Sequence, residues 1–165
     1  MFIGAAANPF ADPVALRPMR LKKKAIAGAD FIQTQLIYDM DRFRSYMKKA
    51  VDLGVTESLS VLAGVGPLKG AGMARYMHNN VPGMSVPDHI IERMEDAVKG
   101  ISSDDKKARV EASRAEGIRI CIEQIEEIKE IEGIAGVHIM AIEWEAAVKP
   151  IVEGAGLYPR PEGND

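Results

Sequence analysis

Short apolar runs alternate with amphipathic segments in the first part of the chain. Strand-like runs begin near Phe2, Phe31 and Ser60, at nearly equal spacing along the sequence. The segments between these runs carry apolar residues at the i, i+3 and i+4 spacing of one helix face. They end in Gly28 and Gly54, as helices commonly do. This alternation predicts βαβ units and a parallel sheet.

The sequence after Pro67 predicts more helix than strand. Five elements are expected in chain order: helices at 69–80, 85–100 and 102–132, a strand within 133–143 and a helix within 144–156. Ser85 and Ser102 each precede an aspartate by three residues, which is the spacing of a capping box. The whole chain therefore contains four βα units, with two helices inserted at about 85–132 before the fourth strand.

Four such units correspond to half of a TIM-type (β/α)8 barrel, which needs eight units and about 250 residues. The chain has 165 residues. We therefore predict an α/β fold of parallel (β/α) units that form half of such a barrel. Residues 1–158 are expected to form a single (β/α)4 half-barrel domain, and residues 159–165 a frayed tail.

Composition and charge exclude several classes of protein. The net charge of −3 does not favour nucleic acid binding, and no apolar run approaches the roughly 18 residues of a membrane span. The single cysteine, Cys121, allows no internal disulfide and is typical of a reducing compartment. We interpret His138, alone in its strand, as a core histidine and expect no metal site. The chain is predicted to be soluble and cytoplasmic.

Two side-chain amides, Gln33 and Gln35, interrupt the apolar run that begins at Phe31. Side chains alternate across a strand, so Phe31, Gln33, Gln35 and Ile37 are expected on one face, which we assign to the barrel interior. Gln35 then lies nearer the carboxyl end of the strand, where barrel active sites are built. Two interpretations remain open: the amides bind a ligand, or they satisfy neighbouring polar groups in the barrel.

Several stretches resemble one known family. They are GAAANPFADP, RLKKKAIAGADFIQTQLIYD, VLAGVGPLKGAGMARYM, VPGMSVPDHIIERM and GVHIMAIEWE with GLYPRP, at 4–13, 20–39, 61–77, 81–94 and 136–161. In this order they resemble the C-terminal half of methylenetetrahydrofolate reductase, in the form found in anaerobes. The resemblance implies a flavin-containing (β/α)8 barrel. It also implies reduction of 5,10-methylene-tetrahydrofolate to 5-methyl-tetrahydrofolate by hydride transfer through the flavin, in one-carbon metabolism and methionine biosynthesis.

The resemblance also implies site residues. Gln35 matches the family glutamine that contacts the pterin, a role that suits an amide because it both donates and accepts. The implied substrate-binding residues are Gln35, Gln33, Glu143 and Trp144. The implied flavin-binding residues are Ala6, Asn8, Asp12, Lys23 and Lys24, with the two lysines near the phosphates.

The resemblance implies no catalytic residue in this chain, because the family's general acid lies on the first strand of the barrel, in the other half. The expected cofactor is FAD or FMN. The expected partners are a folate substrate, NAD(P)H or a redox partner protein, and either a second copy of the chain or a chain that carries the N-terminal half.

Two other functions remain open on the sequence alone. The first is a non-catalytic folate- or flavin-binding half-barrel module of a redox complex. The second is a pterin-binding barrel of the corrinoid methyltransferase type. Bound flavin would separate the reductase from the methyltransferase.

Overall fold

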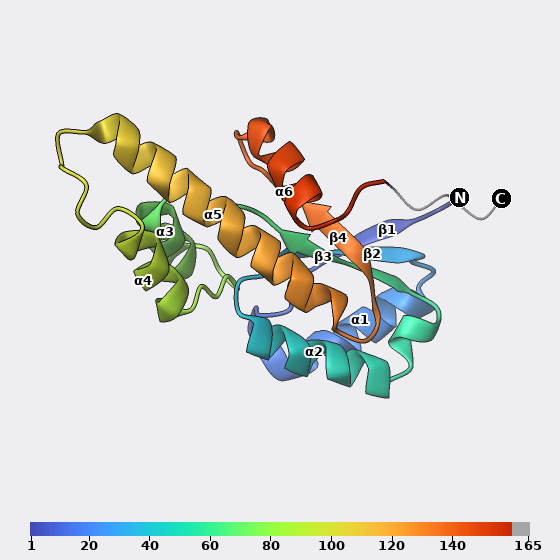
Figure 1. Cartoon of the computed structure of the whole chain (residues 1–165). Coiled ribbons are helices and arrows are strands. Elements are labelled where there is room, and N and C mark those ends of the chain that lie inside the picture. The colour runs from blue at the N-terminus through green and yellow to red at the C-terminus, as the bar shows by residue number, and fades with distance from the viewer. Residues whose placement is uncertain (160–165) are drawn as a thin grey trace.

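Four parallel strands form one sheet, as the sequence predicts. The computed structural model describes residues 1–159 (Figure 1). The order along the sheet, β1-β2-β3-β4, repeats the order in the chain. The strands are β1 (Gly4–Ala7), β2 (Phe31–Leu36), β3 (Ser60–Val65) and β4 (Ile134–Ile139). Parallel neighbours joined by helices are the arrangement of a section of a TIM barrel, so the predicted fold class is confirmed.

Six α-helices connect or follow the strands. They are α1 (Arg17–Ile26), α2 (Met40–Asp52), α3 (Ala71–Asn80), α4 (Asp88–Asp96), α5 (Lys106–Lys129) and α6 (Val148–Gly154). Three short 3-10 turns lie at Val14–Leu16, Val55–Glu57 and Glu145–Ala147. In the described part of the chain, no helix is both long and apolar enough to cross a membrane.

One hydrophobic core lies between the sheet and the layer of α1, α2, α5 and α6 (Figure 1). The strands contribute Ile32 and Val61, and the helices contribute Leu21, Phe43 and Ile125, all at most 1% exposed. Burying such side chains is worth about 1.5–3 kcal/mol each before the entropy of ordering them is counted. The core therefore covers only one face of the sheet.

A second, smaller cluster lies beside the layer. Helix α3 packs on α4, and α4 packs on α5. The cluster includes Met77 of α3, Ile90 of α4 and Ile120 of α5. Figure 1 shows both helices under the amino-terminal half of α5. Because α5 contacts β3 and β4, it is the helix of the third βα unit. Of the two helices predicted as an insertion at about 85–132, α5 therefore belongs to the layer, whereas α4 lies outside it beside α3.

Several predicted boundaries and caps are wrong. β1 begins at Gly4 rather than near Phe2. Ser85 does not cap α4, because its hydroxyl donates to Asp39 Oδ2 at 3.0 Å. Asp105, not Ser102, caps α5 by accepting from the backbone N–H of Ala108 at 3.0 Å. Except for Pro159, the predicted tail at 159–165 lies outside the described residues.

Candidate functional site

The face of the sheet opposite the helices carries the two side-chain amides of β2, Gln33 and Gln35. Across the sheet, Ala6 is in register with Gln33, Gln33 with Leu62, and Leu62 with Gly136. Gln33 is half-buried and Gln35 is exposed. The side chain of Ile32, which points from the sheet toward the helices, is fully buried. The two amides therefore share the open face, as the period-two alternation predicts.

An irregularity in β2 breaks this alternation after Gln35. The Thr34 hydroxyl donates to the carbonyl of Gln35 and accepts from the N–H of Gly64, both at 2.8 Å. A Cβ on Gly64 would lie only 2.5 Å from the carbonyl oxygen of Thr34, so this approach requires glycine. Past the irregularity Ile37 is fully buried in the main core. The prediction that Ile37 shares the open face is therefore wrong.

A hollow of about 400 Å³ lies at the carboxyl ends of β1, β2 and β4, which is where TIM barrels build active sites. Its lining residues are Ala6, Ala7, Asn8, Gln33, Thr34, Gln35, His138 and Met140. The lining includes four of the predicted flavin- and folate-binding residues, namely Ala6, Asn8, Gln33 and Gln35. Their convergence on one hollow supports a binding role for the amides.

His138 also lines the hollow, and the sequence did not lead us to select it as a site residue. Its Nδ1 atom is buried and has no hydrogen-bond partner among residues 1–159, so it is not the satisfied core histidine that we expected. A buried polar atom without a partner costs about 1–3 kcal/mol. The signal was present in the pattern, because His138 alternates with Gly136 and Met140 on the face of β4 that continues the amide face of β2.

A smaller cavity of about 150 Å³ lies beside the hollow and is cationic. Lys24 lines it together with Arg17 and Arg20, and all three share one face of α1 at i, i+3 and i+7. Ala6 and Asn8 line both this cavity and the hollow. The structure thus brings Lys24 to the end of β1, and it adds two arginines that the sequence interpretation did not select.

The loop after β1 is held by its own polar groups. Asn8 Oδ1 accepts from the N–H groups of Phe10 and Ala11 at 3.2 and 3.1 Å, and its Nδ2 donates to Pro82 at 3.4 Å. Arg17 donates to the carbonyls of Ala11 (2.6 Å) and Asp12. The Asn8 amide therefore shapes the loop that borders both cavities.

The remaining predicted residues lie away from the hollow. Lys23 and Asp12 are exposed and line neither cavity, although the Asp12 carbonyl accepts from Arg17, which lines the cationic one. Glu143 has a left-handed φ of 51° and an 88% exposed side chain, and its carbonyl accepts from Lys69 at 3.3 Å. Trp144 packs against the core, with the Arg114 guanidinium 5.3 Å from its ring centre. Glu143 and Trp144 are therefore not brought together with Gln35.

Comparisons with known proteins agree on one family. The model of the methylenetetrahydrofolate reductase family matches residues 3–156. The chain is 25% identical to a probable methylenetetrahydrofolate reductase (NADPH) from Caenorhabditis elegans, over 94% of this chain and 22% of that protein. It is 29% identical to methylenetetrahydrofolate reductase 1 from Schizosaccharomyces pombe, over 83% of this chain and 21% of that protein. The chain thus spans about a fifth of the length of these relatives.

A solved structure shares the fold. It is an uncharacterised protein from Clostridium thermocellum that binds two copies of 5-methyl-5,6,7,8-tetrahydrofolic acid. The TM-score is 0.58, and the match covers 94% of this chain and 52% of that one. At 13% identity this likeness concerns the arrangement of strands and helices.

Proposed function

The chain belongs to the methylenetetrahydrofolate reductase family, and we propose that it forms the folate- and flavin-binding half of such a reductase. The proposed reaction is the reduction of 5,10-methylene-tetrahydrofolate to 5-methyl-tetrahydrofolate. The observation that carries this proposal is the pair of amides, Gln33 and Gln35, on the open face of β2. The description of the Clostridium thermocellum protein as a binder of methyltetrahydrofolate adds support.

Gln35 is the residue that we assign to the pterin. Its side chain is exposed at the end of β2 and lines the hollow. An amide donates through nitrogen and accepts through oxygen, and the edge of a pterin also offers donors and acceptors side by side. Gln33 lies two residues deeper on the same face, where it can fix the orientation of the same ring system.

The cationic cavity fits the phosphate of a flavin nucleotide. Arg20 and Lys24 would hold the phosphate, while Arg17 keeps the adjoining loop in place through its backbone contacts. Charge-assisted hydrogen bonds of this kind are about twice as strong as neutral ones. A bound flavin, FAD or FMN, would supply the hydride transfer, and NAD(P)H or a redox partner protein would supply the electrons.

A second chain is the other proposed component. Among the described residues, β1 and β4 each pair on one side only, and the face that carries Gln35 has no helix layer. Phe2 beside β1 is 75% exposed. Unpaired strand edges and exposed apolar surface favour association. We propose that a second copy, or a chain with the N-terminal half, completes the barrel.

The composition of the hollow indicates what this partner would supply. No carboxylate is among the described residues that line it, so the family's general acid would come from the partner. If no partner supplies an acid, the same residues fit the alternative function, a non-catalytic folate- or flavin-binding module. The single domain at 1–158 and the cytoplasmic location remain predictions.

The test begins with the absorption spectrum of the chain as it leaves a size-exclusion column. We expect flavin absorption on a dimer or larger species. We expect Lys24→Ala to lower the flavin content at least about tenfold, because a charged hydrogen bond is lost. Lys23→Ala removes the same charge one residue away from the cavity and should retain the flavin.

Folate binding is tested separately by titration with 5-methyl-tetrahydrofolate. We expect Gln35→Ala to raise the dissociation constant about tenfold or more, and Glu143→Ala to leave it unchanged. Equal affinity of the Gln35→Ala variant and the unaltered chain would refute the pterin site. If both ligands bind but methylene-tetrahydrofolate is not reduced even with an added N-terminal-half chain, the binding module is the better description.

A further inference from the structure

A second large cavity lies on the other side of the sheet from the hollow. It measures about 390 Å³ and lies between the start of α2, helix α4 and the middle of α5. None of its lining residues lines the hollow or the cationic cavity. A volume of this size is within the range of small-molecule sites. The cavity is therefore separate from the proposed folate and flavin sites.

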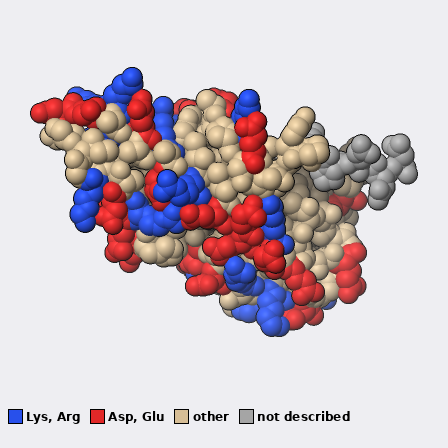
Figure 2. Space-filling view, viewed as in Figure 1, with Lys and Arg blue, Asp and Glu red and all other residues tan. Residues whose placement is uncertain are grey.

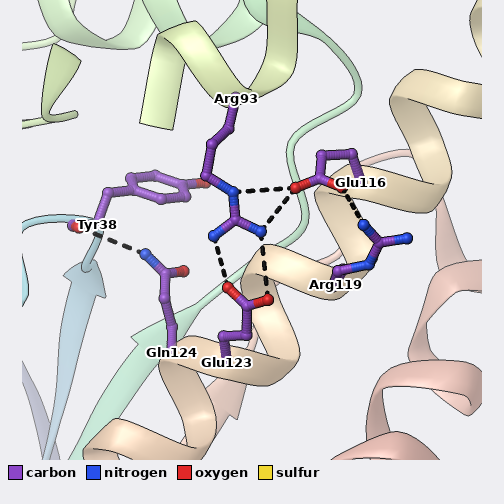
Figure 3. A network of polar contacts seen from close by, with 6 residues as sticks. All are labelled: Tyr38, Arg93, Glu116, Arg119, Glu123 and Gln124. Carbon is purple, nitrogen blue, oxygen red and sulfur yellow. Dashed lines mark hydrogen bonds and ion pairs between the residues drawn. The ribbon is translucent and has the colours of Figure 1, made fainter. Parts of the chain in front are cut away.

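Gln124 of α5 is the unusual residue of this cavity. It is only 3% exposed, and its Nε2 donates to the carbonyl of Tyr38 at 3.4 Å. Its Oε1 atom is buried and has no hydrogen-bond partner within residues 1–159. Figure 3 shows this oxygen on the side of the amide away from Tyr38, facing the Arg93 and Glu123 side chains, which line the same cavity. A leucine would avoid the cost of the unpaired acceptor, so the amide indicates a missing hydrogen-bond donor.

Arg93 of α4 does not supply that donor. Its guanidinium donates to Glu116 at 3.0 and 2.6 Å and to Glu123 at 2.5 and 3.2 Å (Figure 3). The Glu116 carboxylate is 12% exposed and also accepts from Arg119 at 2.8 Å. This network ties α4 to α5 and uses the positive charge of Arg93. These contacts hold α4 against α5 at the cavity without any hydrogen bond to Gln124.

The other polar groups of the cavity are mostly acceptors. Asp41 makes no side-chain hydrogen bond within the described residues. One carboxylate oxygen of Glu127 accepts from Arg44 at 2.8 Å, and the other accepts no hydrogen bond from residues 1–159. Asp39 is already engaged, because it accepts from the N–H of Arg42 and from Ser85. Figure 2 shows acidic and basic side chains interspersed on the face that α2, α4 and α5 present. Within the cavity, free acceptors and negative charge remain.

We infer that this cavity binds a small organic ammonium ion, whose N–H groups donate to Gln124 Oε1 and to the carboxylates of Asp41 and Glu127. A primary ammonium has three donors and one positive charge, so it matches the three free acceptors. An anion would meet four lining carboxylates with one arginine and one histidine, His89. A bare metal ion is a poorer match, because no group of three or more metal-ligating side chains occurs in the described part of the chain.

The probe is putrescine dihydrochloride, titrated calorimetrically into the full chain at constant ionic strength. We expect saturable binding. The comparison ligand is tetramethylammonium chloride, which has a positive charge but no N–H donor, and we expect it not to compete. Equal binding of the two cations would overturn the proposal, since charge alone would then explain the binding. So would the absence of putrescine binding, which would leave the cavity to water.

Variants locate the binding. We expect Gln124→Leu and Glu127→Gln each to weaken putrescine binding at least about tenfold, because each removes an acceptor for a charged donor. Glu126→Gln removes the same charge from the neighbouring position, which pairs with Lys129 outside the cavity, and should bind as the unaltered chain does. Equal weakening by Glu126→Gln and Glu127→Gln would refute the site.

Further variants keep the test decisive if Gln124→Leu does not fold or if folate binding fails. Glu127 and Asp41 are exposed, so Glu127→Gln and Asp41→Asn fold even if Gln124→Leu does not, and unchanged binding by both would refute the proposal. Gln35→Ala should retain putrescine binding, because Gln35 lies in the other cavity. A failure of folate binding would therefore not be confused with a failure at this site.

Discussion

The two faces of the sheet differ sharply although neighbouring residues of the same strands build them. On the covered face, Ile32, Val61 and Ala63 are completely buried under the helices. On the open face, Gln33 and Leu62 remain partly exposed, and Gln35 is exposed. One residue position therefore separates a side chain that stabilises the fold from one that is free to bind. The covered face carries the stability of the chain, and the open face carries its proposed chemistry.

Within residues 1–159, each side of the sheet also has one buried side-chain polar atom without a hydrogen-bond partner. His138 Nδ1 borders the hollow on the open face, and Gln124 Oε1 borders the cavity among the helices. The buried Tyr38 hydroxyl nearby is engaged, by contrast, because it donates to the carbonyl of Gly66 at 3.1 Å. Because most buried polar groups in proteins are paired, these two atoms mark the places where a ligand would complete the structure.

The largest expected difference between the faces is in stability. Ile32→Ala should lower the free energy of unfolding by about 2–5 kcal/mol, because it leaves a cavity in the main core. Gln33→Ala, at the next position but on the open face, should change it by about 0.5 kcal/mol or less. Urea denaturation followed by circular dichroism measures both. Similar losses for the two variants would mean that the open face is also buried in solution.

Two glycines test the same contrast through close packing. A Cβ on Gly117 of α5 would overlap the carbonyl oxygen of Leu68, so Gly117→Ala should cost about 1–3 kcal/mol as the helix is pushed away. A Cβ on Gly136 would meet only the Leu62 side chain, at 3.3 Å. Gly136→Ala should therefore stay within about 0.5 kcal/mol. Thermal unfolding of the two variants measures both changes. Equal losses of stability would show that the open face is packed as tightly at Gly136 as α5 is at Gly117.

The smallest expected effect is the change in the free energy of unfolding with pH that comes from one buried thiol under the helices. Burial raises the pKa of the Cys121 thiol from 9.0 to about 12. The unfolded chain therefore loses this proton at lower pH than the folded chain does. Stability from this group is complete below pH 9 and falls as pH rises toward 12, by about 1.4 kcal/mol per pH unit at most. Urea denaturation at several pH values between 8 and 10 measures the slope.

The Cys121→Ala variant is the control for this titration. Burial also raises the pKa of the Tyr38 and Tyr46 hydroxyls above the ordinary value of 10, so those groups contribute to the slope at higher pH in both proteins. The difference between the two chains should therefore appear between pH 9 and 10. Parallel pH dependences would show that water reaches the thiol in the folded chain.

Much of the fold was predictable because it is encoded locally. Apolar periodicity placed all four strands and the helices between them, and Gly28 and Gly54 mark the ends of α1 and α2 with the positive φ that glycine adopts easily. The face of Gln33 and Gln35 followed from alternation alone. Family resemblance, by contrast, selected Glu143 and Trp144 without their surroundings, and the structure places both away from the hollow.

What the sequence by itself determined is the order and type of the elements and the face on which the amides lie, because both depend on neighbours within one turn or one strand. Only the tertiary structure decided which polar groups are used up and which are free. Ser85 bonds to Asp39, Gly64 approaches Thr34, and Gln124 reaches Tyr38, each across a long stretch of chain. Hydrogen bonds between distant segments leave no periodic trace in a sequence, so the two unpartnered atoms become visible only when the chain is folded.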